Sequence, residues 1–401
     1  MSDINTNRSL KILMITCFPF FSYRGTPIAA KSRLEILSEL GHEVDVVAYH
    51  VGNDFELPGV KILRIINIPF IKEVPIGPSF KKVFLDIFVI FKTIRLLTSR
   101  KYDLVHTHEE SNIFGVIFSK IFRVRHLVDF HGSIPQIMEN CGYGKYKPLI
   151  KILEFFERQA FNSSHGFISL STGSEKYIRN MNDKAPIVVI DDSKNYDFSS
   201  IDKERLASFK LSHPELEDKN IVLYAGTFEL YQGLDLLLAA AKLVIQKNKD
   251  TIFVLVGGRQ DQVNAFKELA ENLGIADHIR FTGFLSINEL AIYMKNSNIL
   301  ISTRNAGDNP PSKIYEYLRA GKPIVATNIS THTQIINEDI AVMVDLTPES
   351  IAEGILSLLD NPSYAKSLGQ KSRQFFENNF SLQKKMEKTK QILNAVMQET
   401  L

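Results

Sequence analysis

Short apolar runs alternate with helix-like stretches along almost the whole chain, and this alternation restricts the fold more than any other feature of the sequence. Lys11 to Thr16 (KILMIT) is a continuous apolar run, as expected for a strand buried on both faces. Residues 28–40 carry apolar positions at helical spacing, and a second strand follows at 44–48. A strand, a helix and a parallel strand in this order predict an α/β fold with parallel sheets covered on both faces.

The pattern stops at a polar, turn-rich segment, DDSKNYDFSS at 191–200, and then starts again. A chain of 401 residues is also too long for one ordinary core. We therefore expect two doubly wound, Rossmann-like domains, at 1–195 and 200–378, facing each other across a cleft, with a helix at 380–401 crossing back onto the first. Further strands are expected at 62–66, 102–106, 127–129, 166–169, 187–190, 221–224, 251–256, 279–281, 299–302, 324–326 and 341–344.

The composition is that of an ordinary globular protein, with 44% hydrophobic and 23% charged residues and a net charge of +2. No basic face is interleaved with aromatic residues, so we expect no nucleic-acid partner. Cys17 and Cys141 form no metal-binding pattern and suit a reducing compartment. The sequence has no signal peptide and no membrane-length apolar run, so we expect a cytoplasmic protein, peripheral to the membrane at most.

Residues 299–328 contain the strongest candidate site. Asn309 can cap a helix with Pro310 at its first position, and Gly321 ends that helix before the next strand. The N-terminus of a helix that follows a strand of a parallel sheet binds anions such as phosphate. We therefore expect a phosphate-binding site there.

Four charged side chains refine this interpretation. Arg304 and Lys313 place positive charge beside the helix start, and Glu316 lies one turn into the helix. A carboxylate at that place can accept hydrogen bonds from the two ribose hydroxyls. With Asp308 eight residues before Glu316, the stretch predicts a nucleotide-sugar site. The alternative is a surface helix with scattered charges.

Three histidines fall at or near the carboxyl ends of predicted strands, where open parallel sheets bind ligands: His106, His108 and His131. We favour His131 for ligand contact, because Gly132 follows it and lets a ligand approach closely. The three histidines could also bind a metal, but no set of acidic residues completes a coordination sphere in the sequence. We expect no metal.

The segment 68–101 is basic and apolar at the same time. Between Lys81 and Lys101 it carries six Lys or Arg and one Asp, with an apolar stripe at Phe84, Ile87, Phe88, Phe91 and Ile94. We favour a stripe that packs on the sheet, because each helix of a doubly wound domain needs one. The alternative is peripheral contact of 68–101 with an anionic membrane, helped by exposed apolar residues such as Phe70.

On these residues, the chain resembles the family 4 retaining glycosyltransferases (glycosyltransferase group 1) of the GT-B fold over nearly its full length. The main likeness is Asp308-x7-Glu316 followed by EYLRAGKPIVA at 316–326, similar to the family's Glu-x7-Glu motif. Other matches are RGT at 24–26, GHEV at 41–44, HG at 131–132, YAGT at 224–227, QG at 232–233, VGG at 256–258 and FTG at 281–283.

The resemblance implies transfer of a sugar from a nucleoside-diphosphate sugar with retained configuration and without a required metal or other cofactor. The first domain would bind the acceptor and the second the donor. Catalytic contacts would come from His131, Asp308 and Glu316. Donor contacts are expected at Gly25, Thr26, Gly226, Thr227, Gln232, Gly258, Arg259, Gly283, Arg304, Ser312, Lys313 and Ile314.

The sequence departs from the family at the donor site. Asp308 stands where glutamate is usual, and Thr227 and Gln232 replace an arginine and a lysine that grip the diphosphate. Two positive charges are therefore missing. We hypothesise that Arg304 and Lys313 replace them.

The predicted function is a hexosyltransferase-type glycosyltransferase acting on a lipid-linked or saccharide acceptor, in glycolipid or polysaccharide synthesis. A nucleotide-sugar epimerase of the same fold and a non-catalytic nucleotide-sugar-binding partner subunit remain as alternatives, the latter because of Thr227 and Gln232. The base, sugar, acceptor, linkage and oligomeric state are left open.

Overall fold

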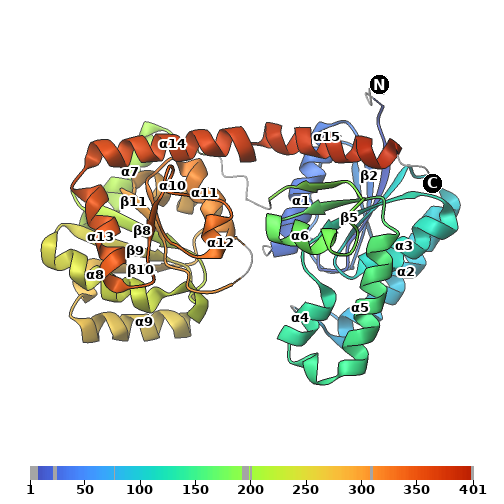
Figure 1. The fold of residues 1–401 in the computed structure, drawn as a ribbon, viewed down its shortest axis with the longest axis horizontal. Helices are drawn as coiled ribbons and strands as arrows, with labels where there is room; N and C mark the ends of the chain where they lie inside the picture. Colours follow the sequence, from blue (N-terminus) through green and yellow to red (C-terminus); the bar gives the residue numbers. More distant parts are fainter. Residues whose placement is uncertain are drawn as a thin grey trace. The chain divides into compact units, whose positions relative to one another are not determined.

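The structure is a computed structural model that describes residues 8–20, 25–75, 77–191, 198, 201–307 and 310–398. Contacts between Cα atoms divide the chain into two compact units. The first consists of Met1–Asp192 and Leu382–Leu401, and the second of Ser193–Ser381. Each unit is built on a parallel sheet with helices on both of its faces (Figure 1). The predicted α/β class with two Rossmann-like sheets is confirmed.

The first unit contains a seven-stranded sheet in the order β3-β2-β1-β4-β5-β6-β7, with every neighbouring pair parallel. Chain order reverses between β1 and β4, so the carboxyl ends of these strands are where ligands bind in such sheets. The strands are β1 (Lys11–Ile15), β2 (Glu43–Ala48), β3 (Val60–Arg64), β4 (Leu104–His108), β5 (Arg125–Phe130), β6 (Gly166–Ser169) and β7 (Ile187–Val189).

The second unit contains a six-stranded parallel sheet in the order β10-β9-β8-β11-β12-β13, with its reversal between β8 and β11. β8 and β9 are buried along almost their whole length, which explains why they read as continuous apolar runs. The strands are β8 (Asn220–Ala225), β9 (Thr251–Val256), β10 (Ile279–Gly283), β11 (Ile299–Ser302), β12 (Ile324–Thr327) and β13 (Val342–Val344).

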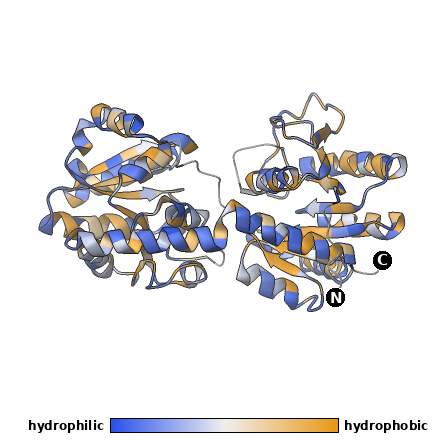
Figure 2. Cartoon of the chain, turned by 90° about the horizontal axis from the view of Figure 1, so that it is seen from above, coloured by the Kyte–Doolittle hydropathy of each residue, from blue (hydrophilic) through white to orange (hydrophobic). Residues whose placement is uncertain are grey.

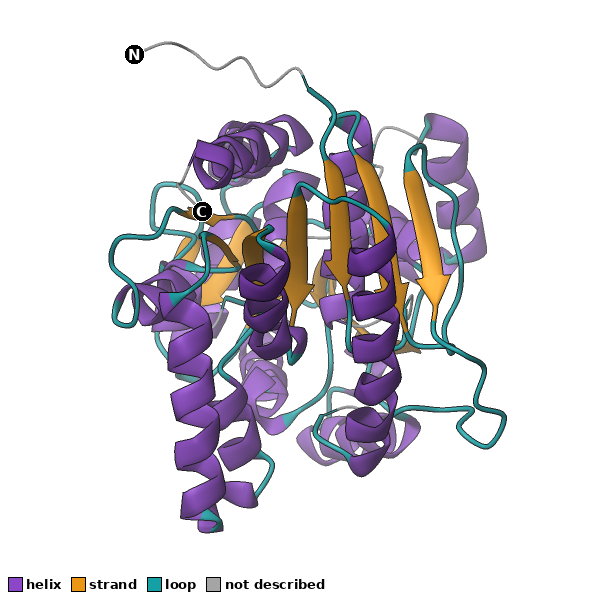
Figure 3. Ribbon diagram, turned by 90° about the vertical axis from the view of Figure 1, so that its right-hand side faces the viewer, coloured by secondary structure: helices purple, strands orange, loops and turns teal. Residues whose placement is uncertain are grey.

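Two helix layers cover the sheet of the first unit. α1 and α15 pack on the face that carries Ile12 and Met14, and α2 and α3 pack on the face that carries Leu13 and Ile15. Figure 3 shows α2, α3 and α5 side by side in front of this sheet, and α3 contacts both of its neighbours. The helices are α1 (Gly25–Glu39), α2 (Phe80–Ser99), α3 (Ser111–Phe122), α4 (Ile134–Asn140), α5 (Lys147–Asn162), α6 (Thr172–Arg179) and α15 (Leu382–Gln398).

The last helix, α15, packs on the first unit although it follows the second unit in sequence. Ile392, Leu393 and Val396 enter the core beneath the Ile12 face. Lys385 forms a buried ion pair with Asp191, with 2.8 Å between Nζ and Oδ1. In Figure 2 the helix alternates between hydrophobic and hydrophilic residues, as expected for a helix that covers a sheet.

The expected packing of the α2 stripe is wrong. The residues of α2 that are buried are Lys82, Leu85, Val89, Thr93 and Leu96. Phe84, Ile87, Phe91 and Ile94 are exposed instead, and Phe88 is partly buried. The helix has apolar residues on both sides, so periodicity alone could not identify the side that faces the sheet.

The helices of the second unit are α7 (Lys203–Ser212), α8 (Leu234–Lys247), α9 (Gln260–Leu273), α10 (Ile287–Asn296), α11 (Ser312–Ala320), α12 (Ser330–Thr333), α13 (Pro348–Leu359) and α14 (Pro362–Phe380). The start predicted for α11 is wrong: the helix begins at Ser312 after Pro311, and Pro310 lies before it. The predicted cap Asn309 is outside the described residues. We did not predict α4, α7, α10 and α12.

None of the helices in the described part of the chain has the length and hydropathy needed to cross a membrane.

Candidate functional site

The N-terminal turn of α11 lies against the loop that follows β8. Lys313 is buried there, and its Nζ donates a hydrogen bond to Gln232 Oε1 at 2.9 Å. The same nitrogen lies 3.9 Å from the centre of the Tyr224 ring. A Cβ on Gly226 would come within 2.9 Å of this nitrogen. The structure therefore brings Gly226, Gln232 and Lys313, all predicted donor contacts, to one place.

Hydrogen bonds hold the loop around this amine. Tyr224 Oη donates to the carbonyl of Thr227 at 2.7 Å, and the Gln232 side-chain amide lies 3.5 Å from Thr227 Oγ1. Thr303, just after β11, donates through Oγ1 to the Gln232 carbonyl at 3.0 Å. Both residues that replace the family's cations, Thr227 and Gln232, are thus fixed around Lys313.

Gly233 allows this close approach. Its φ is 65°, and a Cβ there would lie 2.2 Å from the carbonyl oxygen of Thr303. A larger residue would have to move the backbone of the loop away from β11. This glycine therefore keeps Gln232 in register with Lys313.

The electrostatics of this place are unusual. Burial, and to a smaller extent the neighbouring Arg304, lower the pKa of Lys313 to about 7, while Glu316 acts in the opposite direction. The amine is thus close to losing its charge when no anion is present. An added phosphate would favour the protonated form.

Glu316 lies one turn further along α11 and is buried, as is the whole inner side of this helix. Ser312 is the first helical residue, so its amide and that of Lys313 are among those left without helical partners at an N-terminus. The side chain of Ile314 packs in the core, so a donor contact predicted there would come from its backbone. Asp308 lies outside the described residues.

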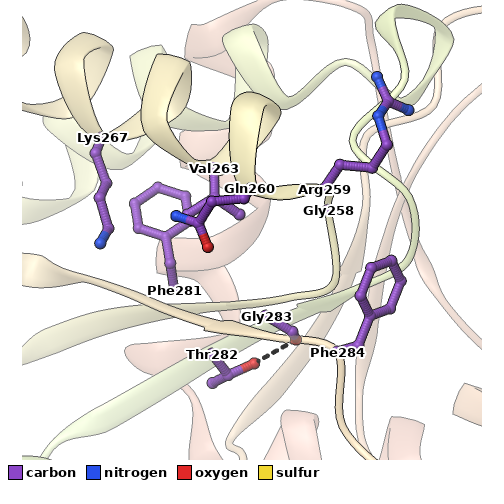
Figure 4. Close-up of a pocket in the computed structure, with 9 residues that line it drawn as sticks. All are labelled: Gly258, Arg259, Gln260, Val263, Lys267, Phe281, Thr282, Gly283 and Phe284. Atoms are coloured by element: carbon purple, nitrogen blue, oxygen red, sulfur yellow. Dashed lines mark hydrogen bonds between the residues drawn. The ribbon is translucent and has the colours of Figure 1, made fainter.

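A pocket of about 380 Å³ lies at the carboxyl ends of β9 and β10 (Figure 4). Three predicted donor contacts line it: Gly258, Arg259 and Gly283. The other lining residues are Gln260, Val263, Lys267, Phe281, Thr282 and Phe284. Arg259 points away from the other side chains in Figure 4 and forms an ion pair with Glu229, with 2.8 Å between Nη1 and Oε1. The pocket combines aromatic walls with a few polar groups and has the size range of small-ligand sites.

In the first unit, His131 follows β5 directly and is almost entirely covered, with 9% of its side chain exposed. Its Nε2 lies 3.3 Å from Asp129 Oδ1 and 3.3 Å from His108 Nδ1. Asp129 is fully buried and accepts a hydrogen bond from Arg33 Nε at 2.9 Å. Burial alone would raise the pKa of Asp129, but Arg33 and the neighbouring imidazoles hold it well below its ordinary value. Asp129 is thus a buried anion beside His131.

Sequence reasoning missed Asp129, although the signal was present. It stands two residues before His131, and residues two apart on a strand face the same side. The ligand atoms of His106, His108 and Asp129 lie within 4.8 Å of one another, so a carboxylate does join the histidines. The expectation that no acidic residue completes this group is therefore wrong. Arg33 already neutralises that carboxylate, which makes the group a poor fit for a cation.

Thr26 lies near the same edge of the sheet, in the first turn of α1, which begins at Gly25. Burial raises the pKa of Glu109, but Lys82, a hydrogen bond with Thr26 and the charge of His131 lower it below its ordinary value. Glu109 follows β4 with a φ of 53°, an uncommon conformation for a residue with a side chain. The structure thus brings Thr26 and His131 into one neighbourhood around Glu109. Arg24 lies outside the described residues.

The chain matches known sequence families over both units. The profile described as "Glycosyl transferases group 1" matches residues 208–375, and that described as "Glycosyltransferase Family 4" matches residues 33–191. Together these ranges span most of the chain.

Individual relatives agree with the profiles. A glycosyltransferase of Methanocaldococcus jannaschii, MJ1178, is 24% identical over 378 residues, which is 91% of this chain and 93% of that protein. The alpha-monoglucosyldiacylglycerol synthase of Streptococcus pneumoniae is 26% identical over 131 residues, covering 29% of this chain and 30% of that protein.

Among solved structures, Anabaena HepE in complex with UDP has a TM-score of 0.73 at 14% identity, covering 96% of this chain and 100% of that one. This likeness concerns the fold alone. The two parallel sheets and this likeness give the GT-B fold, and the two family profiles show that the chain belongs to the glycosyltransferases of group 1 and family 4.

Proposed function

We propose that the chain transfers a sugar from a nucleoside-diphosphate sugar, with retained anomeric configuration and without a metal, to a lipid-linked or saccharide acceptor. The observation that carries the donor assignment is Lys313, a buried amine 2.9 Å from Gln232 at the start of α11. A cation and free amides at a helix start fit a diphosphate. The structural neighbour HepE was solved with UDP, which supports this class of donor.

The chemistry of the proposed step is simple in outline. The bond between the anomeric carbon and the diphosphate oxygen breaks, a bond to the acceptor oxygen forms, and the acceptor proton goes to the leaving diphosphate. Charge develops on the leaving group, so fixed positive groups such as Lys313 lower the barrier. Glu316 would hold the ribose, Asp308 the donor sugar, and the pocket at Gly258 and Gly283 the base.

We also propose that residues 68–101 make peripheral contact with the cytoplasmic face of an anionic membrane. Phe70 and Phe80 are 77% and 94% exposed, and most of the α2 stripe is exposed as well. The relative from Streptococcus pneumoniae is named as the synthase of a diacylglycerol lipid, alpha-monoglucosyldiacylglycerol, which supports a lipid acceptor for this chain.

A non-catalytic nucleotide-sugar-binding subunit is the second candidate, favoured by Thr227 and Gln232 in place of two cations. Thermal shift with UDP, GDP, ADP and their sugars, on the wild type and on Glu316→Ala, tests donor binding. We expect one nucleotide to stabilise the wild type by mass action and to lose this effect in the variant. No shift with any nucleotide would contradict the donor site.

Turnover separates the remaining functions. Incubated with the stabilising sugar nucleotide and no acceptor, an epimerase would release an altered sugar, and a transferase would release only slow hydrolysis products. A binding subunit would release neither, even with acceptor lipids or saccharides added. Nuclear magnetic resonance of the product anomer then tests retention, and turnover in the presence of a chelator tests metal independence.

A further inference from the structure

The three neighbouring helices α2, α3 and α5 turn apolar side chains outward as well as inward. Twelve large hydrophobic side chains of these helices are exposed. They are Phe80, Val83, Phe84, Ile87, Phe91 and Ile94 of α2, Ile117 and Ile121 of α3, and Leu149, Ile152, Phe155 and Phe156 of α5. We call this set the outer helix face.

Packing within the unit does not require these side chains. α5 attaches to the unit through Ile150, Ala160 and Phe161, which are buried. α3 attaches through Val116 and Phe118. An ordinary surface helix would be polar on the remaining side. The outer helix face is therefore an apolar surface in addition to the core.

The other side of the same sheet provides an internal comparison. In the described residues of α1 and α15, which cover that side, Leu382 is the one large hydrophobic side chain that is exposed. Exposed apolar side chains are thus concentrated on one layer of the unit. Exposed apolar surface gathered on one layer in this way is typical of contact with proteins or membranes.

Charge indicates which partner fits. In α2, α3 and α5, six exposed Lys or Arg side chains accompany the apolar ones, against one exposed acidic side chain, Glu154. The six are Lys81, Arg95, Lys120, Lys147, Lys151 and Arg158. Aromatic and aliphatic residues surrounded by cations match the interface of a bilayer that contains anionic lipids.

We propose that the outer helix face docks the first unit on an anionic phospholipid bilayer, with α5 as a contact of its own in addition to α2. This inference rests on the membrane contact proposed for 68–101 and not on the proposed transfer reaction. It extends that contact to two helices in which the sequence showed no membrane signal. Phe155 and Phe156, 58% and 44% exposed, are the aromatic anchors of α5.

The docking helices are tied to the candidate site at their inner sides. Glu157 of α5 accepts hydrogen bonds from Ser133 Oγ at 3.0 Å and from the Ile134 amide at 2.9 Å, just after His131. Lys82 of α2 lies 2.6 Å from Glu110, at the carboxyl end of β4. In Figure 3, α5 also extends past the arrowheads of the strands. A docked face would thus hold this edge of the sheet near the membrane surface.

Vesicle co-sedimentation tests the proposal with the full chain. Vesicles of phosphatidylcholine alone are compared with vesicles that contain about 30% phosphatidylglycerol. We expect the wild type to sediment with the anionic vesicles and to be released by high salt. We expect the F155S/F156S and K151E/R158E variants each to lower the apparent affinity at least about tenfold.

Matched controls lie in the second unit. Leu211, 84% exposed on α7, gives L211S as the apolar control. Exposed Lys242 and Lys249 give K242E/K249E as the charge control. Both controls should bind vesicles like the wild type. Far-ultraviolet circular dichroism and the thermal unfolding temperature of all variants should be close to those of the wild type, which shows that they are folded.

Three outcomes would overturn the inference. Loss of binding in variants of Lys81 and Phe84 but not of Phe155 and Phe156 would restrict docking to α2. No sedimentation of the wild type would remove membrane contact and leave the transferase proposal intact. A dimer in light scattering that F155S/F156S converts to a monomer, without vesicle binding, would make the face a contact between copies of this chain.

Discussion

The ammonium nitrogen of Lys313 lies 2.9 Å from the side-chain oxygen of Gln232, so that a lysine from α11 reaches the position at which the family usually has a lysine. This contact supports the hypothesis that Lys313 and Arg304 replace the two missing positive charges. Arg304, the other residue in that hypothesis, lies close enough to lower the pKa of Lys313.

Lys313→Ala should weaken binding of the nucleoside diphosphate by about 10- to 100-fold, the range for one lost charge-assisted hydrogen bond. Isothermal titration calorimetry measures the Kd of the nucleoside diphosphate for the wild type and the variant. The double variant K313A/Q232K puts the lysine back on the other side of the same contact and should restore most of the affinity. Equal affinity of Lys313→Ala and the wild type would contradict the hypothesis.

Binding should also depend on pH. In the free protein, burial lowers the pKa of Lys313 from its ordinary value to about 7. A bound diphosphate favours the protonated amine and raises that pKa. Above pH 7 binding therefore takes up a proton, and Kd should rise by up to about tenfold per pH unit until the pKa of the complex is reached.

Calorimetry in buffers with different ionisation enthalpies would detect this proton uptake directly. The Lys313→Ala variant serves as the control, because its affinity should not change over the same pH range. A Kd that does not change with pH in the wild type would contradict this prediction. It would mean that the Lys313 amine has the same charge in the free and the bound protein.

Asp129→Asn should destabilise the first unit. Arg33 and Asp129 are both buried, with 2.9 Å between Nε and Oδ2, and the variant leaves the guanidinium without its counter-charge. Loss of one partner of a buried ion pair costs about 3–5 kcal/mol. Denaturant unfolding monitored by circular dichroism measures this cost. His131→Ala keeps the ion pair of Arg33 and Asp129, so it should cost less stability than Asp129→Asn while abolishing turnover, and a fully stable Asp129→Asn would contradict the structural role of the pair.

The strand pattern could be predicted from the sequence because buried parallel strands are continuous apolar runs. The runs at 11–16 and 251–256, for example, match β1 and β9 to within one residue. The Gly321 end of α11 was predicted as well, because a left-handed residue there requires glycine, and its φ is 68°. These features depend on local chemistry.

Features that depend on contacts between distant residues could not be predicted. The partner of Gln232 is 81 residues away, at Lys313, and no spacing rule connects the two. Asp129 binds Arg33 across 96 residues. The orientation of α2 was wrong for a similar reason, since both of its sides are apolar and the choice between them depends on the sheet beneath.

The orientation of α2 has a measurable consequence. Leu85 is fully buried against the sheet, so Leu85→Ala should lower the free energy of unfolding by about 2–5 kcal/mol. Phe91 is 66% exposed, so Phe91→Ser should change it by less than about 0.5 kcal/mol. Denaturant unfolding of the two variants compares the two sides of the helix. A larger loss of stability in Phe91→Ser than in Leu85→Ala would contradict this orientation of α2.

Gly233→Ala should impair donor binding through the backbone. At φ 65° a methyl group would lie 2.2 Å from the Thr303 carbonyl oxygen, so the loop that carries Gln232 must move away from β11. Gly274 provides a matched control, with φ 71° and nothing within 4 Å of an added Cβ. Alanine in the left-handed conformation costs about 1 kcal/mol in both variants, but only the variant at Gly233 also has the clash. Gly233→Ala should therefore lose nucleotide affinity in calorimetry while Gly274→Ala keeps it. Equal affinities would show that the register of Gln232 and Lys313 does not control the donor site.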